Sequence, residues 1–267
     1  MRRLDAGETT AILHDHGLDS PRGPGFAFRD RMRGAFYDWH VHPYHQLIYA
    51  IGGATQIESA QARHVLPAGR AAWIPAGVRH RTLVSQVEAA SLYFAPDTVG
   101  GEDQRVRILL ATPVMREMIL HAMRWPLGAS EADPVAASFF QTLALMCGEW
   151  LESELPLSLP GANHPGLVRA MDHAVGDPGA ATLADALALA GMSERTFRRA
   201  FARETGMGWQ AWLTQARILT ALGLLADGAR VTDVAAEVGY ASLSAFAKAF
   251  AQLTGEAPAD YRRRARS

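Results

Sequence analysis

Residues 231–262 read VTDVAAEVGYASLSAFAKAFAQLTGEAPADYR, and this stretch decides the fold of the C-terminal part of the chain. The run 231–238 has helical periodicity, and residues 239–241 (Gly-Tyr-Ala) have the composition of a turn. Ser242 follows, a residue type that caps helix N-termini, and it opens a second helical run. The stretch therefore predicts two helices joined by a tight turn, the helix-turn-helix arrangement.

The second of these helices has two different faces. Phe246 and Phe250 recur at helical spacing and form its inward face, whereas Ser244 and Lys248 lie on the outward face. Aromatic residues on one side and polar residues on the other fit a helix that packs on its own domain and enters a groove of DNA. We therefore predict that it is a recognition helix.

The same pattern occurs upstream, in GMSERTFRRAFARETG (191–206). The preceding run TLAD (182–185) fits a capping box, which starts a helix, and Ser193 caps the next helix. In that next helix apolar residues share the inward face, and the opposite side is rich in arginine. Arginine pairs with guanine edges or holds phosphates. The arginines on this predicted recognition face are Arg195, Arg198, Arg199 and Arg203.

The two units are joined by WQAWLTQARILTALGLLADG (209–228). A helix of about 18 residues spans roughly 27 Å at 1.5 Å per residue. With the widths of the helices added, the two recognition helices would reach successive major grooves, which lie about 34 Å apart.

These motifs resemble those of a known family. The segment from about Leu167 to Arg264 is similar to the AraC/XylS DNA-binding domain, with Arg217 at the arginine position of the linking helix. The resemblance implies a sequence-specific DNA-binding transcriptional regulator that acts on double-stranded promoter DNA, with RNA polymerase as a further partner. Leu187 departs from the family pattern, and so do two alanines in the second recognition helix, Ala245 and Ala247. We therefore expect the arginines of the first recognition helix to carry most of the specificity.

The predicted DNA-binding residues come from both recognition helices and their caps. They are Ser193, Arg195, Thr196, Arg198, Arg199, Arg203, Ser242, Ser244 and Lys248.

The N-terminal half has a different periodicity. Residues 26–95 read as short strands between Pro and Gly turns, and the strand-like run HQLIYAI is expected to stop at Gly52-Gly53. Two helices are expected at 104–124 and 134–151, and the Pro- and Gly-rich run 155–166 reads as a linker. The predicted fold class is α+β. Its predicted domains are a β-barrel sensor (20–103), a helical packing and dimerisation region (104–154) and an all-α domain with two helix-turn-helix units (165–267).

Histidines gather in the β-rich half. The run GAFYDWHVHPYHQLIYAIGG (34–53) resembles the first cupin motif, with Gln46 where cupins usually have Glu, and GRAAWIPAGVRH (69–80) resembles the second. His40 and His42 have the spacing of residues on one face of a strand. Because imidazole suits Zn, Ni, Fe or Cu, one divalent transition metal is a candidate cofactor. The predicted metal ligands are His40, His42, His80 and, as a weaker fourth, Gln46.

Two alternatives to a metal sensor stay open. The barrel would otherwise bind a small organic effector, as AraC-type sensors commonly do, with the pocket formed by Trp39, Tyr44, Trp73 and Tyr93. A cupin metalloenzyme, a dioxygenase or isomerase, is the other reading, since three histidines leave open coordination positions. An enzyme has no need of the C-terminal half, and we therefore predict a regulator and no catalytic residues.

Composition sets the broad class. The net charge of −1 does not by itself indicate a nucleic-acid binder, but residues 181–267 hold 11 basic and 8 acidic residues, against 15 and 19 in the rest. The single cysteine, Cys147, excludes an internal disulfide and fits a reducing cytoplasm. No apolar run approaches the roughly 18 residues of a membrane span, and the N-terminus lacks an apolar signal core. We therefore expect a cytoplasmic protein.

Overall fold

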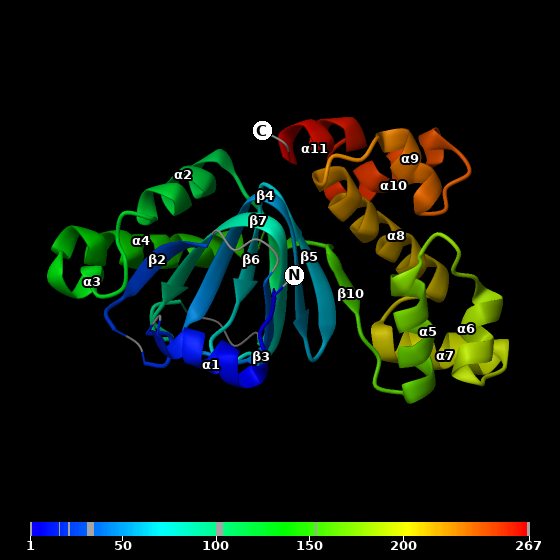
Figure 1. Cartoon of the computed structure of the whole chain (residues 1–267), viewed down its shortest axis with the longest axis horizontal. Coiled ribbons are helices and arrows are strands. Elements are labelled where there is room, and N and C mark those ends of the chain that lie inside the picture. Colours follow the sequence, from blue (N-terminus) through cyan, green and yellow to red (C-terminus); the bar gives the residue numbers. More distant parts are fainter. Residues whose placement is uncertain are drawn as a thin grey trace. The chain divides into compact units, whose positions relative to one another are not determined.

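The computed structural model describes residues 2–15, 17–20, 22–30, 35–99, 104–152 and 154–265. The chain divides into two compact units, one of residues 1–60 and 64–155, the other of residues 61–63 and 156–267. The first unit is rich in strands and the second is helical (Figure 1). The predicted α+β fold class, with a β-rich N-terminal domain, connecting helices and an all-helical C-terminal domain, is confirmed.

The first unit is organised by two long antiparallel strands, β4 (His45–Ser59) and β7 (His80–Phe94). They pair from His45 opposite Phe94 to Ser59 opposite His80. The sheet order is β1-β3-β7-β4-β6-β8-β9, with β2 also on β7 and β5 also on β4. The remaining strands are β1 (Arg2–Arg3), β2 (Gly25–Asp30), β3 (Ala35–His40), β5 (Ala62–Pro67), β6 (Arg70–Ile74), β8 (Arg107–Leu110) and β9 (Glu154–Leu155).

The expected end of a strand at Gly52-Gly53 is wrong, because β4 continues to Ser59. The pairing with β7 shifts register between Ala50 and Gly52 and again between Gly52 and Ala54. Such irregularities bend a strand without ending it, and glycine inside a strand often marks them. The two glycines therefore mark a bend in one long strand.

The expectation of a helix over 104–124 is also partly wrong. Arg107–Leu110 form β8, which pairs with β6, and α2 (Pro113–Ala122) begins only after Thr112. A short apolar run fits a buried strand as well as a helix, and here Ile108 and Leu109 are buried in the sheet. Pro113 occupies the first turn of the helix, where its missing N–H leaves no bond unmade.

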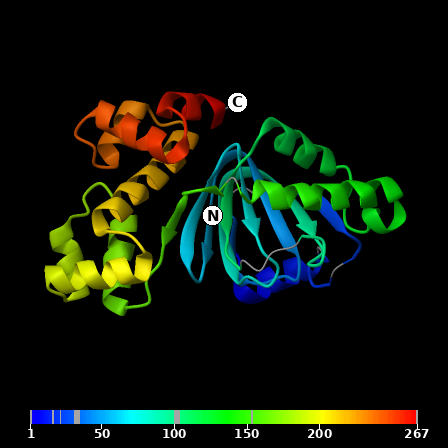
Figure 2. The same ribbon diagram turned by 180° about the vertical axis from the view of Figure 1, so that it is seen from behind.

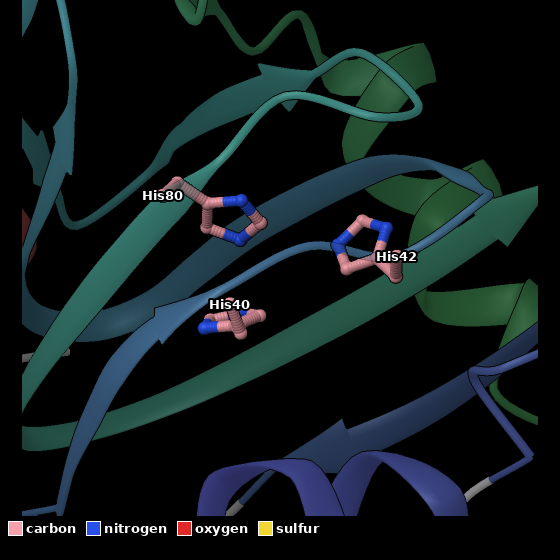
Figure 3. Close-up of side chains that lie close together, drawn as sticks. All are labelled: His40, His42 and His80. Carbon is pink, nitrogen blue, oxygen red and sulfur yellow. The ribbon is translucent and has the colours of Figure 1, made fainter. Parts of the chain in front are cut away.

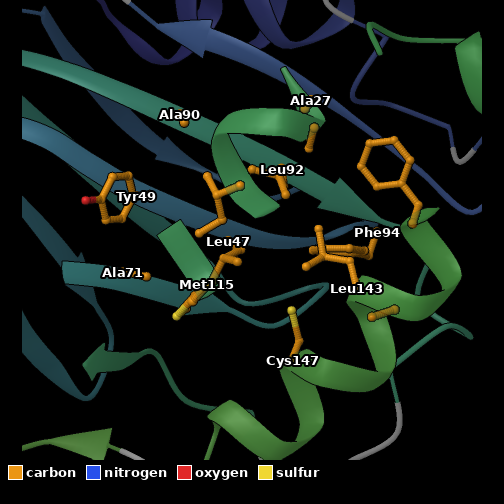
Figure 4. Close-up of a cluster of buried hydrophobic side chains, with 14 of the residues drawn as sticks. Ala27, Leu47, Tyr49, Ala71, Ala90, Leu92, Phe94, Met115, Leu143 and Cys147 are labelled. Atoms are coloured by element: carbon orange, nitrogen blue, oxygen red, sulfur yellow. The ribbon is translucent and has the colours of Figure 1, made fainter. Parts of the chain in front are cut away.

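Helices cover one face of this sheet. The predicted helix 134–151 is confirmed as α4 (Pro134–Trp150), which begins with Pro134 after the cap Asp133. Side chains of α2 and α4 pack on Leu47, Leu92 and Phe94 of the sheet in one buried cluster, shown in Figure 4. The unit also contains α1 (Ala6–Asp15) and α3 (Ala129–Ala132). Cys147 is fully buried in the same cluster, and burial raises the pKa of its thiol, so it is a core residue.

The second unit begins with the short strand β10 (Ser158–Pro160) and is otherwise helical. Its helix α8 (Trp209–Ala226) lies between two groups of helices in both Figure 1 and Figure 2. The others are α5 (Pro165–Gly176), α6 (Leu183–Ala190), α7 (Glu194–Thr205), α9 (Val231–Glu237), α10 (Leu243–Thr254) and α11 (Pro258–Ala265). No described helix of the chain is long and apolar enough to cross a membrane.

The predicted caps of both helix-turn-helix units are confirmed. The side chains of Thr182, Ser193 and Ser242 each accept a hydrogen bond from a backbone N–H in the first turn of α6, α7 and α10, respectively. Gly191 ends α6 in the left-handed conformation, with φ of 65°. Phe197, Phe201, Phe246 and Phe250 are fully buried, so both recognition helices turn their aromatic face inward.

Candidate functional site

Three histidines converge in the β-rich unit (Figure 3). His40 ends β3, His42 lies between β3 and β4, and His80 begins β7 directly opposite His40. One potential ligand atom from each ring lies within 4.8 Å of the others. His42 and His80 are only 3% and 1% exposed, so the cluster is held inside the unit. The sequence motifs therefore identify side chains that the fold brings together, although Gly34 of the first motif lies outside the described residues.

Backbone carbonyls orient all three imidazoles. The Nδ1 atoms of His40, His42 and His80 lie 2.7, 2.9 and 2.9 Å from the carbonyl oxygens of Asp38, Tyr44 and Val78. A carbonyl oxygen only accepts, so each Nδ1 carries a proton and donates it. In a neutral ring the Nε2 atom then presents its lone pair. A hydrogen bond of this kind on the far nitrogen is the usual support of a metal-ligating histidine.

The environment keeps these rings neutral. Burial lowers the pKa of His40, lowers the pKa of His42 to about 4 and lowers the pKa of His80 well below its usual value. After burial, repulsion from the neighbouring histidines lowers the pKa of His42 and His80 further. Metal ligation requires neutral imidazole, and the folded protein therefore supplies it without first removing protons.

Gln46 extends the cluster. Its Oε1 lies 3.1 Å from His42 Nε2, and its Nε2 donates to the Tyr93 hydroxyl at 2.6 Å. With Nδ1 protonated, His42 Nε2 is an acceptor, and the Gln46 amide group beside it presents either its N–H or its oxygen according to its rotation. Three imidazole nitrogens and one amide oxygen are a donor set that fits a divalent transition metal.

The structure separates the four predicted pocket residues. Tyr44 and Tyr93 are buried together with Phe26, and the ring of Tyr93 lies 5.5 Å from that of His42. Trp73 belongs instead to the buried cluster beneath α2 and α4, where it stacks on His45. Trp39 is half-buried and belongs to neither cluster, and the guanidinium groups of Arg79 and Arg81 each lie 5.0 Å from its ring. Tyr93 therefore lies beside the histidine cluster, and Tyr44 packs edge-on against Tyr93.

A further buried histidine, His64, is not part of any motif identified in the sequence. His64 on β5 is 5% exposed, and neither ring nitrogen has a hydrogen-bond partner among the described residues. Burial lowers its pKa to about 4, and the charge of Arg105 acts in the same direction. Alternation along β5 gives the only sequence signal, because His64 and Leu66 share the buried face.

The predicted DNA-binding residues lie on the exposed surface of the second unit. On α7, Arg195 and Arg199 are exposed, four residues apart, and have no ion-pair partner among the described residues. Arg198 differs, because Glu194 holds it at 2.7 Å. Arg203 lies 3.4 Å from Glu204. The free arginines are therefore positioned one helical turn apart on one face.

The second recognition helix presents a less polar surface. The Ser242 hydroxyl caps α10 and lies 3.3 Å from the Ser244 hydroxyl, just as the Ser193 and Thr196 hydroxyls lie 3.0 Å apart on α7. Lys248 is exposed, and so is Leu243, at 47%. Lysine binds phosphates or guanine edges, serine binds several partners, and leucine offers only apolar contact, so this surface favours fewer specific base contacts than the arginines of α7.

Comparisons with known proteins agree with this arrangement. A family model described as an AraC-like ligand binding domain matches residues 23–155, and one described as a helix-turn-helix domain matches residues 187–264. The chain is 30% identical over 230 residues to the HTH-type transcriptional regulator NimR of Escherichia coli (strain K12), covering 83% of this chain and 81% of NimR.

Other matches cover single parts of the molecule. The HTH-type transcriptional regulator RipA of Corynebacterium glutamicum is 35% identical over 71 residues, which are 27% of this chain and 22% of RipA. The solved DNA-binding domain of AdpA, crystallised with a target DNA, is 32% identical and covers 38% of this chain and 92% of that chain, with a TM-score of 0.35.

The chain belongs to the AraC family of helix-turn-helix transcriptional regulators. It is a DNA-binding regulator of transcription with an N-terminal ligand-binding domain, and its named relatives are regulators rather than enzymes.

Proposed function

We propose that the N-terminal domain senses a divalent transition metal, bound by His40, His42 and His80 with Gln46 as a weaker fourth group. The observation that carries the proposal is that a backbone carbonyl anchors the Nδ1 of every one of the three rings. With each Nδ1 donating to a carbonyl oxygen, the three Nε2 atoms keep their lone pairs available for one shared ligand. A buried cluster of imidazoles without a ligand would have to satisfy these nitrogens in another way.

The metal would act by binding one conformation of the regulator better than another. A ligand shifts a conformational equilibrium only by its difference in affinity for the two states. The imidazole ligands favour Zn, Ni, Fe or Cu over Mg or Ca, which prefer oxygen ligands. We therefore expect the response to be specific for transition metals.

The test is metal analysis of full-length protein purified without an affinity tag, with thermal unfolding before and after addition of Zn²⁺ or Ni²⁺. Wild-type protein should gain stability with added metal by mass action. The double variant His42→Ala/His80→Ala should lose metal binding and the gain in melting temperature. The matched control is His64→Ala, which removes a buried histidine outside the cluster and should keep the metal response. Wild-type protein without bound metal or metal-dependent stabilisation would contradict the proposal.

A small organic effector is the second candidate. It is favoured by the aromatic surroundings of the cluster, where Phe26 stacks on Tyr93 at 5.1 Å and Tyr44 lies edge-on to Phe26 at 5.3 Å. Under this alternative the histidines would be the polar lining of the pocket. Failure of the metal test combined with stabilisation by a small aromatic compound would favour it.

We propose that α7 carries most of the sequence readout, with Arg195 and Arg199 on base edges. Their exposure and lack of partners support this role. The remaining predicted residues are assigned to phosphate and cap contacts, or to apolar base contacts from the α10 side. They are Ser193, Thr196, Arg198, Arg203, Ser242, Ser244 and Lys248.

We also propose that the protein forms a homodimer through the helical region 104–154. In the sequence this region follows the proposed sensor domain (20–103) and precedes the proposed DNA-binding domain (165–267). Supporting this, α4 has no charged residue from Pro134 to Gly148, and Val135 and Leu145 are 64% and 74% exposed. Leu145→Glu should convert a dimer to a monomer in sedimentation, because it would bury a charge in an apolar contact. Val41→Glu, at another exposed apolar site, is the control. A wild-type monomer at micromolar concentration would contradict the dimer.

The proposed partners and location follow from the function of a transcriptional regulator. Promoter DNA and RNA polymerase are its proposed macromolecular partners, and the cytoplasm is its proposed location.

A further inference from the structure

The two helix-turn-helix units touch each other through bare backbone. Gly179, in the loop between α5 and α6, lies against the C-terminal end of α9 and the turn that follows it. A Cβ on Gly179 would lie 2.1 Å from the carbonyl oxygen of Glu237, and a Cβ on Gly239 would lie 2.7 Å from the carbonyl oxygen of Gly179. No side chain fits at either position without moving one backbone away from the other.

One side chain of α8 reaches both units at the same place. The Nε of Arg217 donates to the carbonyl oxygen of Pro178 at 2.9 Å. Its guanidinium carbon lies 3.2 Å from the position that a Cβ on Gly239 would take. We call the group Pro178, Gly179, Arg217 and Gly239 the inter-unit clasp. It connects the loop before the first helix-turn-helix, the linking helix α8 and the turn of the second helix-turn-helix.

The two glycines have separable roles. Gly239 has a φ of 83°, which favours glycine whatever its neighbours are. Gly179 is not among the glycines with positive φ, so its missing side chain serves the close approach alone. Substitution of Gly179 therefore tests the contact without disturbing a turn.

The clasp bears on how the two recognition helices are placed. Helix α8 has 18 residues and is about 27 Å long, so it sets the distance between the units. The length of α8 alone does not fix how the two helix-turn-helix motifs are rotated about the axis of this helix. Successive major grooves follow the DNA helix with a repeat of about 10 base pairs, so a change in this rotation moves one recognition helix out of its groove.

We infer that the inter-unit clasp positions α7 and α10 for two DNA boxes at one fixed spacing, and that Gly179 and Arg217 are positioning residues for DNA recognition. Neither residue needs to touch DNA for this role. The inference rests on the proposal that both recognition helices read DNA.

The experiment uses the full-length protein and a DNA site that the wild-type protein selects from a random duplex library. Affinities are measured by fluorescence anisotropy on three duplexes: the selected site, the site with its second box scrambled, and the site with one base pair inserted between the boxes. The variants are Gly179→Ala and Arg217→Ala. Their matched controls are Gly176→Ala, whose new Cβ would meet nothing within 4 Å, and Arg169→Ala, which removes a hydrogen bond from α5 to Leu189 at the end of α6.

Both clasp variants should bind the two-box site roughly 10- to 100-fold more weakly than wild type, the loss expected when one set of base contacts fails. They should bind the single-box duplex within about twofold of wild type, and the inserted base pair should matter less to them. The controls should behave as wild type on all three duplexes. Because Arg217→Ala adds no atoms to the contact, it still tests the role of the clasp if Gly179→Ala does not fold.

Three results would overturn the inference. One is a ratio of two-box to single-box affinity that stays at the wild-type value in both clasp variants. Another is an equal loss on both duplexes, because the contact would then only support the fold. A selected site with a single box would also overturn it. Wild-type protein that selects no sequence would instead overturn the proposed readout, and the clasp with it.

Discussion

The histidine cluster and the arginine face of α7 place their functional groups in opposite environments. His42 and His80 are buried, neutral and anchored by backbone carbonyls. Arg195 and Arg199 are exposed, charged and unanchored. The fold therefore holds the three imidazoles in place by itself, whereas under the proposed readout the arginine side chains become ordered on DNA. Changes in the first should act through stability and metal, and changes in the second through DNA affinity and salt.

The largest expected effect on DNA binding comes from the exposed arginines of α7. Arg195→Ala should weaken binding to the selected DNA site by about 1–3 kcal/mol, and Arg199→Ala by a similar amount, because each loses a bidentate contact to a base. The melting temperature should stay near that of wild type, since neither side chain has a partner in the described structure. Anisotropy titration and thermal unfolding measure the two quantities.

Arg198→Ala is the matched comparison on the same helix. Glu194 already holds this guanidinium at 2.7 Å, so its removal should weaken binding to specific and non-specific DNA alike. Equal losses of specificity in all three variants would remove the distinction between free and paired arginines.

The next prediction concerns a buried histidine, His64, and the dependence of folding stability on pH. His64 has a pKa of about 4 in the folded protein and 6.5 as its ordinary value. Between these values the unfolded chain binds more protons, so stability falls as the pH falls from about 6.5 to 4. The loss is on the order of 3 kcal/mol for this residue. His64→Leu should therefore lose less stability between pH 7 and pH 4 than wild type, measured by urea unfolding in EDTA.

This prediction isolates His64 from the three clustered histidines, which act in the same direction in both proteins. Parallel pH profiles for wild type and His64→Leu would show that the buried ring is not the source of acid sensitivity.

The smallest expected effect compares the two helix-turn-helix units. Ser193→Ala and Ser242→Ala each remove the side-chain acceptor that caps a recognition helix. Each should lower the free energy of unfolding of its unit by about 1 kcal/mol, and hydrogen exchange should rise only in the first turn of the affected helix. Exchange that rises throughout both units would contradict this local role.

The helical C-terminal part and the β-rich N-terminal part also differ in how far their structure could be predicted from sequence. Capping residues act on their own helix, so Thr182, Ser193 and Ser242 could be placed without knowledge of the fold. The course of β4 beyond Gly52 depends on its pairing with β7, a strand that lies later in the sequence, as the pairing of Thr55 with Val84 shows. Local sequence does not contain that information.

The same limit applies within the candidate site. Motif spacing identified His40, His42 and His80, but the carbonyl anchors are main-chain groups that any sequence supplies. The sequence predicts Trp73 as a pocket residue beside the two tyrosines, yet Trp73 lies in the cluster under α2 and α4. Only the strand register decides which face a side chain takes.

The most direct test of the proposed function is the DNA affinity of full-length protein with and without Zn²⁺. Protein treated with a chelator is titrated onto the selected DNA site, with and without saturating Zn²⁺. We predict that Zn²⁺ changes the affinity of wild-type protein by about 5- to 150-fold, the usual range of coupling between two sites, and leaves His42→Ala/His80→Ala unchanged. Identical binding curves for wild-type protein with and without Zn²⁺, or an equal response in the double variant, would contradict the account.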